Sequence, residues 1–262
     1  MRKRFIAGNW KMNNGPSATV AFMDKFATAL KSSNEIISNI NGGKMDVAVF
    51  APSISLCSAV KARGDAPVIV GGENVHWEKS GAFTGEISVP MLKEVGCTHV
   101  IIGHSERRHI FRETDEELHK KMLAALDGGL TPVLCTGELL EEREAGKAFD
   151  VIKNQLLADL KDLDPQTVAD KIIIAYEPVW AIGTGKTASK EDAEEVCKFI
   201  RKLLGDTFGE GTAAKVLILY GGSVKPENTA DILSQEDIDG VLVGGASLKP
   251  DSFLAIAKAA VR

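Results

Sequence analysis

The stretch Lys171-Ile172-Ile173-Ile174-Ala175-Tyr176-Glu177-Pro178 decides the predicted fold. After its first lysine it is an almost continuous apolar run, rich in β-branched residues, and it ends abruptly on a carboxylate and a proline. A strand of this composition is typical of a parallel sheet whose two faces are both covered, because neither face needs polar residues. The stretch therefore predicts a buried parallel strand with a carboxylate at its carboxyl end.

Seven further runs of the same kind occur along the chain, and helical patterns separate them. The eight predicted strands cover residues 5–8, 46–50, 68–71, 98–103, 131–135, 171–176, 216–220 and 240–243. The clearest helical patterns cover residues 17–30, 114–127, 191–204 and 251–260. Successive strands begin about 34 residues apart, and a βα unit needs about 30 residues. Eight units in a chain of 262 residues predict an α/β fold, a closed (β/α)8 barrel that forms one domain over residues 1–262. An open doubly wound sheet is the alternative.

The composition excludes several classes of partner. The formal net charge is −5 and no long basic cluster occurs, which argues against duplex nucleic acid and anionic membranes. No apolar stretch approaches the roughly 18 residues that a membrane span requires. Four widely spaced cysteines without a CxxC motif predict reduced, buried thiols and a cytoplasmic location. The five histidines lack paired ligand spacing, so we expect no metal site.

A barrel predicts that functional groups stand at the carboxyl ends of its strands. Asn9 and Lys11 follow the first predicted strand. In an extended chain residues i and i+2 point the same way, so both side chains are expected to enter one pocket. The alternative is a surface lysine beside a structural asparagine.

His104 directly follows the fourth predicted strand and precedes a polar segment that can begin a helix. A helix N-terminus opposes an imidazolium charge, so His104 is expected to be neutral and to act as a hydrogen-bond donor. A histidine that only satisfies local backbone is the alternative. Glu106 is expected to pair with Lys11, or else with Arg107 or Arg108 at the surface.

Glu177 follows the sixth predicted strand. Desolvation at the end of so apolar a strand is expected to raise its pKa. That predicts a general base.

Glycines dominate the ends of the last strands. The segment from Pro178 to Ala188 is expected to form a glycine-rich lid. A P-loop is excluded because Trp180 occupies its first glycine position. A dinucleotide-binding fingerprint is disfavoured because it would have to follow the strand at once. The pairs Gly221-Gly222 and Gly244-Gly245 follow predicted strands seven and eight. Barrels often bind phosphate there through backbone N–H groups, although tight turns would also explain such pairs.

Together these residues resemble the triosephosphate isomerase family over essentially the whole chain. The stretches that carry the resemblance are GNWKMN at 8–13, GAFTGE at 81–86, GHSERR at 103–108, AYEPVWAIGTGKT at 175–187, YGGSV at 220–224 and VGGASL at 243–248. The family is itself a standard example of tuned acid–base groups on a TIM barrel, so the following roles are carried over from it.

The resemblance implies interconversion of dihydroxyacetone phosphate and D-glyceraldehyde 3-phosphate through an enediolate, without cofactor or metal. Glu177 would move the proton, His104 would stabilise the oxygens as a neutral electrophile, and Lys11 with Asn9 would offset oxyanion charge. The residues that would bind the phosphate by backbone N–H groups are Gly183, Ser223, Gly244 and Gly245.

The resemblance also implies a homodimer through the loop from Gly72 to Gly85, with Thr84 reaching the partner's site. Position 73 is Glu73 in this chain, where the family usually has glutamine, and this difference puts the strength of the dimer interface in doubt. Two alternatives remain: a metal-dependent phosphosugar epimerase on a similar barrel, or a non-catalytic phosphate-binding relative. The missing metal-ligand spacing argues against the first, and the presence of Glu177, His104 and Lys11 against the second.

Overall fold

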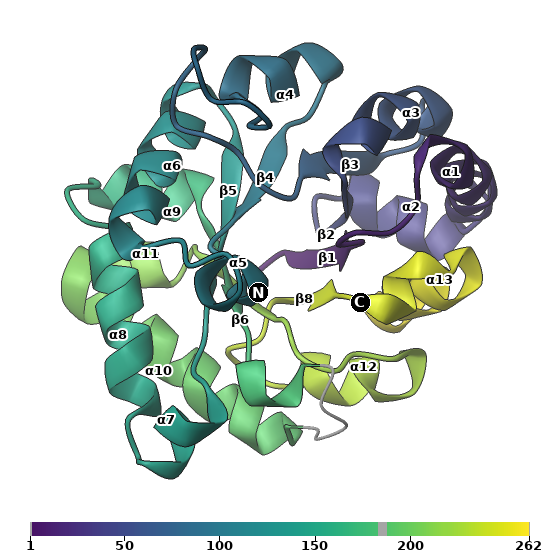
Figure 1. The fold of residues 1–262 in the computed structure, drawn as a ribbon. Helices are drawn as coiled ribbons and strands as arrows, with labels where there is room; N and C mark the ends of the chain where they lie inside the picture. The colour runs from purple at the N-terminus through teal and green to yellow at the C-terminus, as the bar shows by residue number, and fades with distance from the viewer. Residues whose placement is uncertain (1, 183–187, 262) are drawn as a thin grey trace.

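Eight parallel strands close into a barrel in the computed structural model, which describes residues 2–182 and 188–261 (Figure 1). The strands are β1 Arg4–Asn9, β2 Met45–Ala51, β3 Val68–Gly72, β4 His99–Ile102, β5 Thr131–Thr136, β6 Ile173–Tyr176, β7 Leu217–Tyr220 and β8 Gly240–Val243. Each strand pairs with the next, and β1 also pairs with β8, with Phe5 opposite Gly240. This last pairing closes the barrel. The (β/α)8 prediction is therefore confirmed, and the open sheet is wrong.

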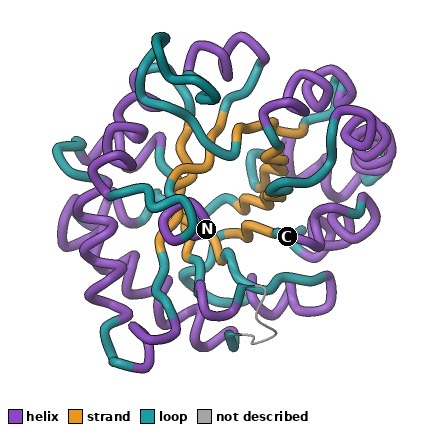
Figure 2. Tube along the Cα trace, viewed as in Figure 1, coloured by secondary structure: helices purple, strands orange, loops and turns teal. Residues whose placement is uncertain are grey.

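Helices surround the strands, as Figure 2 shows by colour. The longer ones are α1 Pro16–Lys31, α2 Asn34–Asn41, α3 Ser53–Arg63, α6 Asp115–Asp127, α8 Ala148–Asp159, α10 Lys190–Phe208, α12 Pro226–Leu233 and α13 Pro250–Ala259. The shorter ones are α4 Val89–Val95, α5 Ser105–His109, α7 Leu140–Glu144, α9 Pro165–Lys171 and α11 Glu210–Ala213, with 3-10 turns η1 Val179–Ala181 and η2 Gly245–Leu248. No helix within residues 2–182 and 188–261 is long and apolar enough to cross a membrane.

The predicted helices form close to their expected bounds. Helix α6 begins with a capping box, in which Glu117 accepts a bond from the Thr114 N–H at 2.8 Å. In α1 the expected apolar stripe is buried except at Val20, which is 40% exposed. Thr19 is buried in its place, because it lies three, four and seven residues before Phe22, Met23 and Phe26, on the same face of the helix.

Alternation along the strands creates two apolar layers. The smaller cluster fills the barrel and consists of inward-facing strand residues such as Phe5, Phe50 and Leu219. The larger cluster lies between strands and helices and joins residues such as Ile6 of β1 to Phe26 of α1. Because side chains alternate, the last positions of the inward series, at the strand ends or just beyond them, emerge at the mouth of the barrel. Asn9 and Glu177 are two of these positions.

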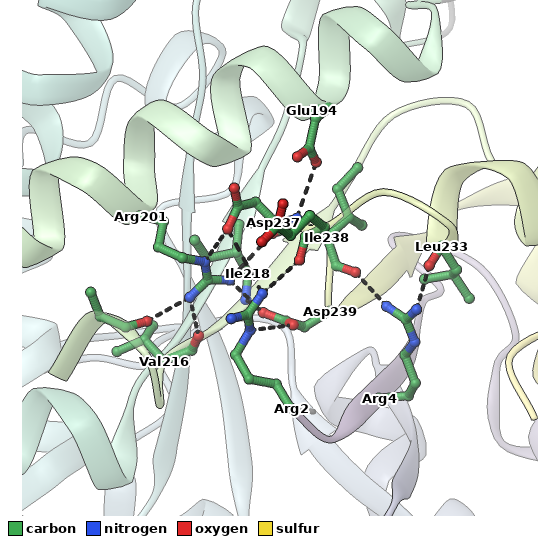
Figure 3. Close-up of polar contacts among 12 residues, drawn as sticks. Arg2, Arg4, Glu194, Arg201, Val216, Ile218, Leu233, Asp237, Ile238 and Asp239 are labelled. Carbon is green, nitrogen blue, oxygen red and sulfur yellow. Dashed lines mark hydrogen bonds and ion pairs between the residues drawn. The ribbon is translucent and has the colours of Figure 1, made fainter. Parts of the chain in front are cut away.

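Arginines tie the start of β1 and helix α10 to the segment before β8, as Figure 3 shows. Arg2 Nε donates to Asp239 Oδ1 at 2.6 Å, and Arg201 Nη2 of α10 donates to Asp239 Oδ2 at 2.7 Å. Arg201 also pairs with Asp237. Arg4 donates to the carbonyl groups of Leu233 and Ile238. These contacts join the first and last strands at the end of the barrel where the strands begin.

The four cysteines are free thiols. Cys97, Cys135 and Cys197 are buried as expected, but Cys57 of α3 is exposed, so the prediction is wrong there. The buried residues of α3 include Ser55, Leu56 and Ala59, and position 57 lies off that face.

Candidate active site

A cavity of about 520 Å³ lies at the carboxyl ends of the strands. Its size is that of a small-molecule site. Seven of the residues predicted for the site line it: Asn9, Lys11, His104, Glu177, Ser223, Gly244 and Gly245. The eighth, Gly183, lies outside the described residues, as does the centre of the expected lid. The structure thus brings together side chains from the ends of β1, β4 and β6 with the glycine turns after β7 and β8.

Glu177 is 2% exposed and both of its carboxylate oxygens have partners. Oε1 lies 2.8 Å from His104 Nε2. Oε2 accepts a hydrogen bond from the backbone N–H of Ser105 at 2.8 Å. The carboxylate is therefore held by the segment after β4.

These partners reverse the expected pKa shift of Glu177. Burial alone raises the pKa, as the sequence analysis expected, but His104, the Ser105 N–H and the charge of Lys11 stabilise the carboxylate. Together they hold the pKa of Glu177 below its usual value. The expectation of a raised pKa is wrong, because the compensating donors come from other strands.

His104 caps the N-terminus of α5 with its side chain and is 5% exposed. Its Nδ1 accepts a hydrogen bond from the Glu106 N–H at 3.2 Å. Its other ring nitrogen, Nε2, points to Glu177. The cap fixes the orientation of the ring, so that one nitrogen faces backbone and the other faces the carboxylate.

Lys11 reaches the cavity by a different route from the one predicted. Strand β1 ends at Asn9, and Lys11 has a φ of 54°, so the chain is not extended there. Asn9 Oδ1 accepts a bond from the Lys11 N–H at 3.1 Å and holds this turn. Lys11 Nζ pairs with Glu106 Oε1 at 2.8 Å. Of the partners considered for Glu106, the structure therefore has Lys11 and not a neighbouring arginine.

The glycine turn after β7 has a packing role beside Glu177. The Gly221 N–H donates to the Tyr176 carbonyl at 2.7 Å. A Cβ atom at position 221 would lie 3.0 Å from Glu177 Cγ. A larger residue at this position would press on the Glu177 side chain, and glycine leaves that space to it.

Ser105 is the main site residue that the sequence analysis missed. It acts through its backbone N–H, which every residue except proline carries, so its residue type gave no signal. Its position directly after His104, at the first turn of α5, was the only available indication. Lys225 and Leu242 also line the cavity without having been predicted, and so does Ile182, which belongs to the expected lid segment.

No group of three or more potential ligands suited to a metal ion occurs among residues 2–182 and 188–261. The chemistry that the described cavity offers is that of a buried carboxylate, an imidazole and an ammonium group.

Comparison with known proteins agrees with this geometry. The family model described as triosephosphate isomerase matches residues 4–260. The chain belongs to the triosephosphate isomerase family. It is 51% identical over 256 residues to the triosephosphate isomerase of Alkaliphilus metalliredigens, an alignment that covers 98% of this chain and 99% of the relative. It is 50% identical over 255 residues to that of Lactobacillus delbrueckii subsp. lactis, with 97% of each chain covered. The chain is therefore an isomerase of this family, and the resemblance noted from its motifs is confirmed.

Proposed function

We propose that the chain interconverts dihydroxyacetone phosphate and D-glyceraldehyde 3-phosphate in the cytoplasm, by proton transfer through an enediolate and without a cofactor or metal. The observation that carries the proposal is the meeting of Glu177 and His104 at 2.8 Å inside a cavity that Lys11 and Asn9 also line. A base, a donor to oxygen and a cation are the groups that an aldose–ketose isomerisation needs.

In this proposal Glu177 takes a proton from carbon 1 of the ketose. The electron pair of that C–H bond forms the enediolate double bond, and negative charge develops on the carbonyl oxygen. His104 Nε2 donates its proton to the oxygen on carbon 2 and then takes the hydroxyl proton from the oxygen on carbon 1. Glu177, now a carboxylic acid, returns its proton to carbon 2, and the electron pair left on the carbon 1 oxygen forms the aldehyde carbonyl. The 3.2 Å bond from the Glu106 N–H to His104 Nδ1 supports a neutral imidazole with its proton on Nε2, the nitrogen that would donate to the substrate oxygens.

Lys11 and Asn9 complete the charge balance of the site. Lys11 Nζ would offset charge on the oxyanion and on the phosphate while Glu106 holds its position. The phosphate would bind to the backbone N–H groups of Ser223, Gly244 and Gly245, together with Gly183 as the family resemblance implies. The places of the first three on the cavity wall support this assignment, and Gly244 and Gly245 lie at the start of the turn η2.

A coupled isomerase assay, with and without EDTA, tests the proposal. We expect turnover of both triose phosphates, no effect of EDTA, and near-complete loss of activity in Glu177→Gln, which keeps the shape of the side chain but cannot accept the proton. Activity that requires a metal would support an epimerase-like mechanism. Inactivity together with phosphate binding would indicate a non-catalytic relative.

We also propose that the chain works as a homodimer through the loop from Gly72 to Gly85. Phe83 at the tip of this loop is 42% exposed, and Met12 is 96% exposed. Met12 and Phe111 line a groove that also includes Gly72 and Gly85. A second copy of the chain that covered this apolar surface would stabilise the dimer. Sedimentation at micromolar concentration should give the dimer mass, and an active monomer would contradict this proposal.

A further inference from the structure

The side chain of Gln155, on α8, binds the end of strand β5 through three hydrogen bonds. Its Oε1 accepts from Thr136 Oγ1 at 2.7 Å and from the Gly137 N–H at 3.0 Å. Its Nε2 donates to the Gly137 carbonyl at 3.2 Å. The amide therefore meets both backbone groups of Gly137, and neither a carboxylate nor an apolar side chain could make all three contacts.

Gly137 in turn lies directly against the backbone of Glu177. A Cβ atom at position 137 would be 1.8 Å from the Glu177 carbonyl oxygen. On either side of this contact, the Glu177 N–H donates to the Thr136 carbonyl at 2.8 Å and the Val179 N–H donates to the Glu138 carbonyl at 3.2 Å. The segment that Gln155 binds is thus the surface on which the backbone of Glu177 rests.

We propose that Gln155 is a positioning residue for Glu177, acting through Gly137. Gln155 is absent from the described lining of the cavity, so it would not contact the substrate. A glycine has the most conformational freedom of any residue, and here the amide of Gln155 holds it at both its N–H and its carbonyl. The inference rests on the proposed role of Glu177 as the base.

The decisive variant is Gln155→Leu, which keeps the approximate volume of the side chain and removes all three hydrogen bonds. A base displaced by about an ångström can lose roughly a hundredfold in rate, so we expect kcat to fall about 10- to 100-fold. KM and the inhibition constant of inorganic phosphate should stay within about twofold of wild type, because the phosphate-binding turns follow other strands. The isotope effect on kcat with substrate deuterated at the transferred position should increase, since proton transfer becomes slower than the other steps.

Two further variants separate positioning from stability. Gln155→Glu keeps the acceptor for Thr136 and Gly137 but cannot donate to the Gly137 carbonyl when ionised. Its kcat should therefore lie between those of wild type and Gln155→Leu. If Gln155→Leu does not fold, Gln155→Glu tests the proposal in its place. Ile152→Val, a fully buried position on the same helix, should lower the Tm and leave kcat and the isotope effect unchanged.

The outcomes distinguish this inference from the function on which it rests. An active Glu177→Gln enzyme would overturn the proposed base. An inactive Glu177→Gln enzyme, combined with folded Gln155 variants whose kcat and isotope effect match wild type, would overturn the positioning role alone.

Discussion

His104 Nε2 lies 2.8 Å from Glu177 Oε1, although the two residues follow strands that are not neighbours in the barrel. Strand β5 lies between β4 and β6, and Gly137 follows it. Because Gly137 has no side chain, the backbone of Glu177 can approach it closely. The backbone position of one of the two candidate site residues therefore depends on a residue that has no side chain of its own.

Glu177→Asp withdraws the carboxylate by one methylene while keeping its charge. We expect kcat to fall roughly a hundredfold, because proton transfer requires the base within hydrogen-bonding reach of the carbon, whereas KM should change little. Steady-state kinetics in both directions measure this. Near-normal kcat would remove Glu177 from the role of base.

Lys11→Met removes the ammonium group that pairs with Glu106 in the cavity. The loss should raise KM and lower kcat together, each by about tenfold or more, since in the proposed mechanism one cation would interact with both the phosphate and the developing oxyanion. Lys202→Met is the matched control, because Lys202 forms an exposed pair with Asp206 on α10 and is absent from the described lining of the cavity. If Lys11→Met behaved like this control, Lys11 would be an ordinary surface residue.

Glu73→Gln should stabilise the protein in a pH-dependent way. Burial raises the pKa of Glu73 to about 8, and the charge of Glu106 adds to the effect, while contacts with Lys11 oppose it. Its Oε1 is buried and has no hydrogen-bond partner among the described residues. The folded protein therefore binds this proton more tightly than the unfolded chain does, and its stability falls as pH rises from about 4.5 to about 8.

A glutamine at position 73 stays neutral, so the variant does not lose stability as the pH rises. We expect the free energy of unfolding to rise by on the order of 2 kcal/mol at pH 9 and by little at pH 4.5. Urea unfolding at both pH values measures this difference, with the exposed Glu94→Gln, outside the proposed interface loop, as the control. An equal gain at both pH values would show that the ionisation of Glu73 is not the cause.

Arg201→Met tests the contacts that join α10 to the segment before β8 (Figure 3). The substitution leaves the Asp237 and Asp239 carboxylates, which are 12% and 3% exposed, without one of their cations. Removing one partner of a buried ion pair costs about 3 kcal/mol or more, which urea unfolding would detect. The neighbouring Lys202→Met breaks only an exposed pair with Asp206 and should cost less than about 0.5 kcal/mol. Equal effects of the two substitutions would contradict this explanation.

The sequence by itself determined the eight strands, their order and the residues at their carboxyl ends. It could do so because each strand is a short apolar run and each polar residue at its end departs sharply from that run. The same local signal identified Asn9, Lys11, His104 and Glu177, which all line the cavity.

Only the tertiary structure decided how these residues interact. The pKa of Glu177 is lowered because the Ser105 N–H and His104 reach it from another strand, and no pattern within residues 171–178 contains that information. Lys11 enters the cavity through a left-handed turn, not along an extended strand. Gln155 meets Gly137 because α8 packs against β5. Burial and hydrogen bonding across strands depend on distances in space, which adjacency in sequence does not record.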